Sequence, residues 1–213
     1  EAPRDPFIFL VRGDAHHNLG QYDRAVVEYT RALEMDGTVA DAILARAAAF
    51  TAQDSFDAAW QDLRSALELE PKDAGVLVRL AMLHTSRRDY KSALDAASQA
   101  VKAAPDHPEA HLRAGNVHYF LRDYKGSLES FLKAVSLDPL NPNGHNGVGL
   151  AYFALRRNAS ALESYSRAVA LDPNSDRFYR NRGSTYTKLK DFANAAADFR
   201  IARLVSTDSA LIE

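Results

Sequence analysis

Apolar residues recur along this chain with helical spacing, in short stretches separated by polar breaks. Apolar positions spaced three and four residues apart are typical of amphipathic helices. Polar breaks such as Leu19–Asp23 and Leu121–Asp123 divide the stretches into pairs, and each pair has the length of two short helices. The pattern therefore predicts an all-α chain built from helix-turn-helix units.

Small residues recur at three positions of a unit that repeats every 34 residues without insertion or deletion. The predicted units are residues 6–39, 40–73, 74–107, 108–141, 142–175 and 176–209. Position 8 of the unit is Gly13, Ala47, Ala81, Gly115, Gly149 and Gly183. Position 20 is Ala25, Ala59, Ala93, Ser127, Ala161 and Ala195. Position 27 is Ala32, Ala66, Ala100, Ala134, Ala168 and Ala202. Because small side chains let helices approach closely, we expect positions 8 and 20 to meet inside a hairpin and position 27 to meet the next unit.

Larger residues keep the same register. Position 17 is aromatic in five units, as Tyr22, Phe56, Tyr90, Tyr124 and Phe192, and Asn158 departs from this pattern. Position 24 is Tyr29, Leu63, Ala97, Phe131, Tyr165 and Phe199. Position 32 is proline in four units, as Pro71, Pro105, Pro139 and Pro173. Proline cannot continue a helix and is common just beyond its end, so position 32 marks the end of each hairpin.

Over residues 6–209 the chain resembles the tetratricopeptide repeat family, and the fourth unit, from Pro108 to Pro139, shows the pattern well. The resemblance implies a single right-handed superhelical solenoid of six units. A lone hairpin cannot bury its apolar face, so units stack and share a core. Residues 1–5 are then a flanking segment, and residues 210–213 are the start of a truncated further helix. We expect such a solenoid to bind proteins rather than to catalyse a reaction.

The composition of the chain argues against several classes of function. The formal net charge of −2 argues against nucleic-acid binding. No apolar run approaches the roughly 18 residues that a membrane span needs. The chain has no cysteine, which excludes disulfides, thiolate metal sites and cysteine nucleophiles. The lack of cysteine fits a reducing compartment, and the expected location is cytoplasmic.

The chain shows no pattern that predicts a catalytic, cofactor or metal site. No nucleophile motif, P-loop or dinucleotide-binding glycine pattern occurs, so we expect neither enzymatic activity nor a cofactor. Five histidines fall at repeat positions that hold aromatic residues elsewhere, namely His16, His84, His118, His111 and His145. We interpret them as packing residues. Trp60, the only tryptophan, is expected in the core, and the acceptor triplet Asn158-Ala159-Ser160 is interpreted as a chance match to a glycosylation site.

Positions 2, 5, 6, 9, 12 and 13 line the concave face in this family. In units one to three these positions are mostly apolar, and they include Phe7, Leu10, Val11, Asp14, Leu44, Ala45, Ala48, Val78 and Met82. Arg79 is the first strong charge. In units four to six the residues at these positions are mainly basic, amide or aromatic: Arg113, Asn116, Tyr119, Phe120, Asn143, Asn146, Phe153, Arg177, Arg180, Asn181 and Lys188. Glu109 is the one acid expected there.

This polarity suggests that an acidic or C-terminal peptide lies across units four to six. Arginine binds carboxylates with two prongs, and asparagine pairs with the groups of an extended backbone. A co-chaperone type of clamp is an alternative, in which Asn116 matches and Arg177 preserves charge, whereas Leu112, Gly147 and Asn181 do not match. The chain could also be a structural segment of a larger assembly, with end-to-end association through the uncapped C-terminal end, or a recruiting arm of an enzyme.

Overall fold

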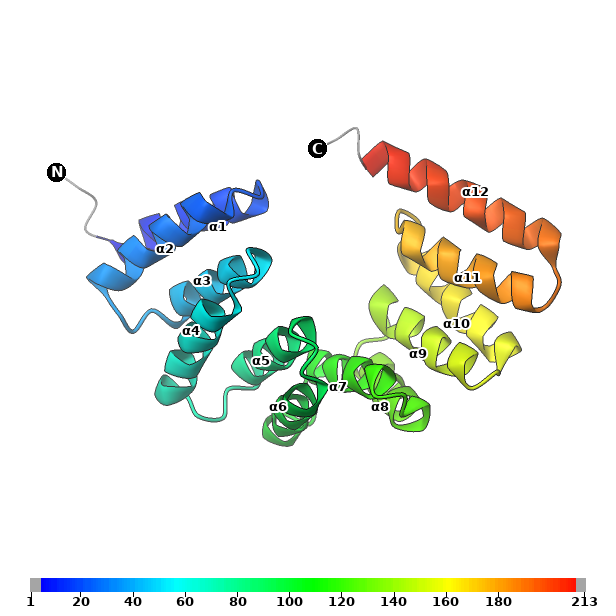
Figure 1. Ribbon diagram of the computed structural model, residues 1–213, viewed down its shortest axis with the longest axis horizontal. Coiled ribbons are helices and arrows are strands. Elements are labelled where there is room, and N and C mark those ends of the chain that lie inside the picture. Colours follow the sequence, from blue (N-terminus) through cyan, green and yellow to red (C-terminus); the bar gives the residue numbers. More distant parts are fainter. Residues whose placement is uncertain (1–4, 210–213) are drawn as a thin grey trace. The chain divides into compact units, whose positions relative to one another are not determined.

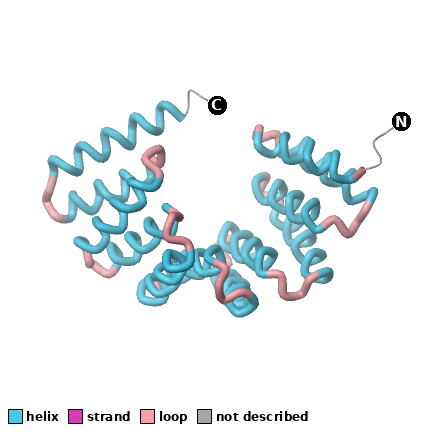
Figure 2. Tube along the Cα trace, turned by 180° about the vertical axis from the view of Figure 1, so that it is seen from behind, coloured by secondary structure: helices cyan, strands magenta, loops and turns pink. Residues whose placement is uncertain are grey.

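The computed structural model describes residues 5–209, which form twelve helices and no strand (Figure 1). The first six helices are α1 (Pro6–Asn18), α2 (Tyr22–Met35), α3 (Ala40–Ala52), α4 (Phe56–Leu69), α5 (Ala74–Ser86) and α6 (Tyr90–Ala103). The other six are α7 (Pro108–Phe120), α8 (Tyr124–Leu137), α9 (Pro142–Ala154), α10 (Asn158–Leu171), α11 (Asp176–Lys188) and α12 (Phe192–Ser209). Short loops join them (Figure 2).

The helices divide into two compact units, an N-terminal unit (Glu1–Ala104) and a C-terminal unit (Pro105–Glu213). Within each unit every helix packs against the next one in the chain. First helices of neighbouring hairpins also touch, as α1 and α3, α7 and α9, and α9 and α11 do. The predicted fold class, an all-α repeat of helix-turn-helix units, is confirmed. A single continuous solenoid over residues 6–209 stays a prediction, and the further helix expected at residues 210–213 lies outside the described residues.

Each hairpin turns through one residue in the left-handed backbone region, at position 15 of the repeat. The six residues have φ between 56° and 70°, and they are Gly20, Asp54, Arg88, Arg122, Arg156 and Lys190. The amide that follows closes the turn by donating to the carbonyl four residues before position 15, as Asp123 N does to His118 O at 2.9 Å. This is the Schellman arrangement, which satisfies carbonyls left open at the end of the first helix.

Where position 8 is glycine, an aromatic ring at position 24 lies against it. A Cβ added to Gly13 would lie 2.4 Å from the Tyr29 ring, and one added to Gly115 would lie 2.7 Å from the Phe131 ring. Position 20 also approaches position 8, since the Ser127 hydroxyl donates to the Gly115 carbonyl at 2.9 Å. The expected contact of positions 8 and 20 is therefore present in the fourth hairpin, and the ring of position 24 shares the space.

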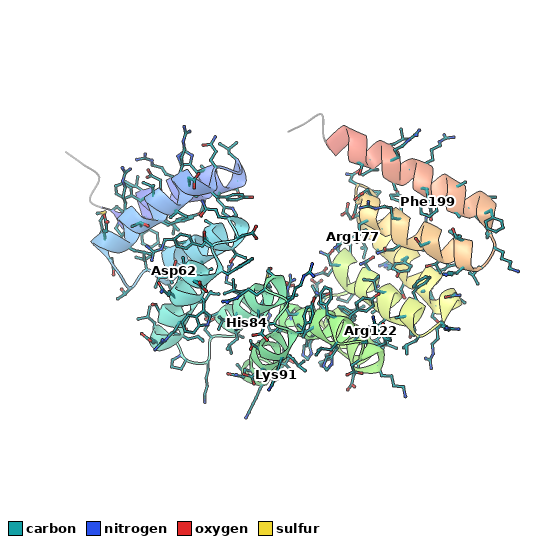
Figure 3. All side chains as sticks on the ribbon, viewed as in Figure 1. Asp62, His84, Lys91, Arg122, Arg177 and Phe199 are labelled. Carbon is teal, nitrogen blue, oxygen red and sulfur yellow. The ribbon has the colours of Figure 1, made fainter. Side chains whose placement is uncertain are left out.

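An ion pair with a buried carboxylate joins the two helices of three hairpins, between position 7 and position 23. The pairs are Arg12 with Glu28, Arg46 with Asp62, and Arg182 with Asp198. Figure 3 labels Asp62 on α4, where it accepts from Arg46 Nη2 at 2.7 Å. In the second hairpin Arg46 also donates to the Thr30 hydroxyl of the preceding hairpin. In the sixth hairpin Arg182 donates to the Ser166 hydroxyl in the same way. The pair thus ties neighbouring repeats together.

The expectation that Trp60 lies in the core is wrong. Its side chain is 37% exposed on α4, and the Arg64 guanidinium lies 5.6 Å from its ring centroid. Apolar spacing alone marked this residue as buried, but the position lies at the edge of the helix's buried face. A guanidinium over an aromatic face makes a cation–π interaction, which stabilises such a partly exposed ring.

Candidate functional site

The candidate site is the face that the first helices α7, α9 and α11 present in the C-terminal unit. Two hydrogen bonds connect α11 to α9 along this face. Asn181 Nδ2 donates to Asn146 Oδ1 at 2.7 Å, and Arg177 Nη2 donates to Asn143 Oδ1. Asn146 is buried, whereas Asn143 and Arg177 are exposed. The structure thus brings four of the predicted site residues together in one polar row.

Two of the predicted arginines are already paired with acids of their own helices. Arg113 donates to Glu109, with its Nε at 2.7 Å from the carboxylate oxygen. Arg180 Nη2 lies 2.7 Å from Asp176 Oδ2. Asp176 is at position 1 of the repeat, outside the positions used for the prediction, and it adds a second acid beside the predicted arginines. The four-residue spacing of Asp176 and Arg180 was a visible signal for this pair.

The remaining predicted cations have no acidic partner among the described residues. Arg177 carries its charge over the Phe178 ring, 5.1 Å from the centroid, and bonds to the neutral amide of Asn143 (Figure 3). Lys188 is exposed near the end of α11. The uncompensated positive charge among the predicted residues of the C-terminal unit therefore comes from Arg177 and Lys188 of α11, rather than from Arg113 of α7 and Arg180 of α11.

An aromatic cluster stands at the end of α7. The Tyr119 ring lies 5.5 Å from Tyr124 and 6.4 Å from Phe120, between ring centroids. The Tyr119 phenol is protonated at neutral pH, and burial raises its pKa further above that pH. Phe120 is 49% exposed, and Phe153 of α9 is half-buried. These rings supply apolar surface beside the polar row, as the sequence predicted for an apolar side chain of a ligand.

The other predicted residues differ in exposure. Asn116 is half-buried on α7. Arg79 lies in the N-terminal unit, on α5, and is exposed. Of the apolar residues expected on the face of units one to three, Leu10 and Val78 are buried. They contribute to the core rather than to a binding surface.

The histidines interpreted as packing residues are half-buried and bond to nearby turns. His111 Nε2 lies 2.8 Å from the Pro105 carbonyl oxygen, and His145 Nε2 lies 2.9 Å from that of Pro139. His118 Nδ1 lies 2.9 Å from Asp123 Oδ2. Among the described residues no three histidine or acidic side chains gather in a group suited to a metal ion. Within residues 5–209 no helix combines the length and the apolar character needed to cross a membrane.

Three models of tetratricopeptide repeats match the sequence, over residues 8–38, 78–142 and 149–190. Together these segments span well over half of the chain, and the structure shows the hairpins that such repeats form. The chain belongs to the tetratricopeptide repeat family. Members of this family are generally scaffolds for protein–protein interaction. No curated protein matches the sequence.

Several solved structures share the fold at low identity. The crystal structure of the APC/C hetero-tetramer Cut9-Hcn1 matches 97% of this chain with a TM-score of 0.87 and 17% identity, and the chain spans 41% of the matched one. The Pseudomonas aeruginosa pilF structure matches 93% of this chain and 91% of its own, with a TM-score of 0.78 and 20% identity. TTC0263 of Thermus thermophilus, a thermophilic repeat protein of this family, matches 85% and 99%, with a TM-score of 0.74 and 19% identity.

Proposed function

We propose that this protein is an interaction module that binds a peptide segment of a partner protein on the face formed by α7, α9 and α11. The observation that carries the proposal is the polar row of Asn143, Asn146, Arg177 and Asn181, which is continuous across two helices. Side-chain amides offer both a donor and an acceptor, as an extended peptide backbone requires. The exposed ring of Phe120 gives an apolar contact on the same face.

The preferred ligand is acidic. Arg177 and Lys188 bring positive charge without an acidic partner among the described residues, and Arg113 and Arg180 can exchange their intrahelical acids for a ligand carboxylate. Arginine–carboxylate pairing is directional and adds specificity as well as attraction. Because these groups are largely exposed, screening by salt should weaken the attraction. Binding that falls as ionic strength rises would support an acidic ligand.

A co-chaperone type of clamp fits the structure less well. Such a clamp needs an asparagine where this chain has Gly147. A Cβ at Gly147 would lie 2.5 Å from the Phe131 ring, so this place has no room for a side chain while the ring occupies it. Leu112, at another clamp position, is 5% exposed and belongs to the core. A general acidic peptide therefore remains the better proposal.

The proposal is tested by selecting peptides from a random display library against the whole chain and measuring their affinity by fluorescence anisotropy. Arg177→Glu should weaken binding of a selected peptide at least tenfold, and the Arg113→Glu/Arg180→Glu double variant should weaken it less for each charge reversed. Arg167→Glu, on an exposed position of α10, makes the same charge change away from this face. Equal affinities for wild type and Arg177→Glu would refute the proposal.

A second candidate is a structural role in a larger assembly. It is favoured by the apolar side chains that α12 exposes, with Phe199 at 42%, Ile201 at 37% and Leu204 at 52% (Figure 3 labels Phe199). Exposed apolar surface of this kind is typical of a contact with another protein. Analytical ultracentrifugation of the wild type and an Ile201→Glu variant distinguishes self-association through α12 from peptide binding on the α7–α9–α11 face.

A further inference from the structure

The second hairpin carries a small pocket that the proposed face in the C-terminal unit does not include. Its volume is about 120 Å³, and it lies between α3, α4 and α5. The lining residues are Ala47, Ala48, Thr51, Leu63, Arg79 and Met82. The Thr51 hydroxyl donates to the Ala47 carbonyl at 2.8 Å, inside its own helix. The walls are therefore mainly aliphatic, with one charged group, Arg79.

The repeat explains why this pocket exists. Two repeats later, the residues equivalent to Ala47, Leu63 and Arg79 are Gly115, Phe131 and Gly147. There the Phe131 ring lies between both glycines, at 2.7 Å and 2.5 Å from where their Cβ atoms would be. In the second hairpin a leucine replaces the phenylalanine, and the space that a ring fills in the fourth hairpin stays partly open.

The size of the pocket suits an apolar side chain. A cavity of about 150 Å³ lined by aliphatic and aromatic residues binds benzene, so a space of 120 Å³ accepts a leucine side chain or most of a phenyl ring. Met82, 41% exposed at the pocket, is unbranched and adapts to the shape of a bound group. In the fourth hairpin the phenyl ring at this place lies against two glycines, whereas here Ala47 and Arg79 leave a smaller space that remains open to a side chain from outside.

Arg79 sets the charge of the ligand. It is exposed on α5, and no hydrogen bond or ion pair within residues 5–206 engages its guanidinium. An unpaired arginine beside an aliphatic pocket is complementary to a peptide segment in which an apolar residue stands next to an acidic one. Other lining residues carry no charge, so selectivity for an acidic neighbour depends on Arg79.

We propose that this pocket binds a phenylalanine or leucine side chain of a partner protein, with a glutamate or aspartate beside it in the partner's sequence paired to Arg79. The anchor residue lies within a segment rather than at a chain end, because the same face continues over α1. There the exposed side chains of Phe7 and Val11, at positions 2 and 6 of the repeat, offer apolar surface to a chain that extends past the pocket.

The probes are peptides with blocked ends, Ac-Gly-Ser-Phe-Glu-Gly-Ser-amide and its Phe-Gln and Ala-Glu counterparts, titrated into the whole isotope-labelled chain and followed by NMR. We expect saturable shifts at Ala47, Ala48, Thr51 and Met82 with the Phe-Glu peptide and binding at least fivefold weaker with either counterpart. Arg79→Gln should weaken the Phe-Glu peptide at least fivefold and leave the Phe-Gln peptide within twofold. Lys91→Gln, which removes one positive charge from an exposed position of α6, should change neither (Figure 3).

A variant that fills the pocket provides an independent test. Ala47→Gly with Leu63→Phe and Arg79→Gly copies the fourth hairpin and places a ring in the open space, so it should abolish the shifts with the Phe-Gln peptide, which does not depend on Arg79, while retaining the helical circular dichroism of the wild type. If that variant does not fold, Ala48→Leu narrows the pocket from its lining and should weaken binding in the same way. Absence of saturable shifts at millimolar Phe-Glu peptide would overturn the proposal. So would tighter binding of a Gly-Ser-Gly-Phe peptide with a free carboxylate, because that result would assign the pocket to a chain end.

Discussion

The ion pair between Arg182 and Asp198 allows a sharp test of how buried charge contributes to a hairpin. Arg182 donates to both carboxylate oxygens of Asp198 at 2.8 Å, and the Arg182 and Asp198 side chains are 18% and 5% exposed. Asp198→Ala removes the acid and leaves a largely buried guanidinium with the Ser166 hydroxyl, at 3.3 Å, and the Tyr179 ring, whose centroid is 5.7 Å away. Breaking a buried pair in this way typically costs about 3 to 5 kcal/mol. Because Arg182 keeps some contact with water, we expect about 3 kcal/mol, on the order of a hundredfold in the opening equilibrium.

The chain itself suggests the compensated variant. In the fifth hairpin the equivalent positions hold Val148 and Ser164, which carry no charge. The double variant Arg182→Val/Asp198→Ser copies that pair and leaves no buried charge without a partner. Replacement of a buried ion pair by residues that pack without charge is often neutral or stabilising, so the double variant should stay within about 1 kcal/mol of the wild type.

Stability is measured by urea unfolding, with hydrogen exchange of the α11 and α12 amides to localise the effect. Local measurement matters because repeat proteins can unfold one segment at a time. Glu163→Ala, at an exposed acid of α10, is the control and should change stability by less than about 0.5 kcal/mol. The reasoning is refuted if Asp198→Ala costs less than about 1 kcal/mol, or if the double variant is as unstable as the single one.

Four further substitutions probe the turns, the glycines and one histidine. Gly20→Ala should destabilise the protein by about 1 kcal/mol, because no atom lies near the added Cβ and only the positive φ opposes a side chain. Arg156→Gly should stabilise the protein by about the same amount, because Arg156 has a positive φ that glycine adopts without strain. Gly147→Ala should cost about 1 to 3 kcal/mol, since its Cβ would press on the Phe131 ring. Burial lowers the pKa of His84, so the folded state favours the neutral ring. The contribution of His84 to stability is therefore complete above the ordinary pKa of 6.5 and falls as the pH drops below that value. His84→Phe should remove this part of the pH dependence of stability.

Thermal and urea unfolding measure the effects of Gly20→Ala, Arg156→Gly and Gly147→Ala, and urea midpoints between pH 5 and 8 measure the effect of His84→Phe. A destabilising Arg156→Gly would show that backbone strain does not govern the turn. A Gly147→Ala variant as stable as the wild type would show that the Phe131 ring moves aside freely. A wild type and a His84→Phe variant with parallel pH profiles would contradict the role given to that histidine.

Much of the fold could be predicted because a repeat multiplies weak signals. Six copies of each position made small and apolar places visible, and the helices start at intervals of 34 residues, as Pro108 and Pro142 do. The contact between positions 8 and 20 was expected, and the Ser127 hydroxyl makes it. The ring of position 24 beside position 8 was missed, although glycine accompanies an aromatic residue there in four hairpins.

The candidate site was harder to predict because a repeat position gives the place of a side chain on its helix but not the residues that it contacts. Asn146 and Arg180 share position 5, yet one is buried and bonded to Asn181 and the other is exposed and paired with Asp176. Whether a basic side chain is available to a ligand depends on such contacts, which come from the next hairpin or from the preceding turn. The pocket beside Arg79 likewise required knowing that Leu63 leaves space.

The Phe131 ring lies against both Gly115 and Gly147, so the packing at this junction depends on the order of the hairpins. Deletion of residues 142–175 keeps the repeat register but brings Asn181 to the place of Gly147, where the ring leaves no room for it. A duplicated fourth hairpin would meet the same obstacle, because Arg113 would then take the place of Gly147. The repeats look like interchangeable modules, but at this junction the fourth hairpin is fitted to the fifth, so loss or gain of a copy here would demand a compensating change in its neighbour.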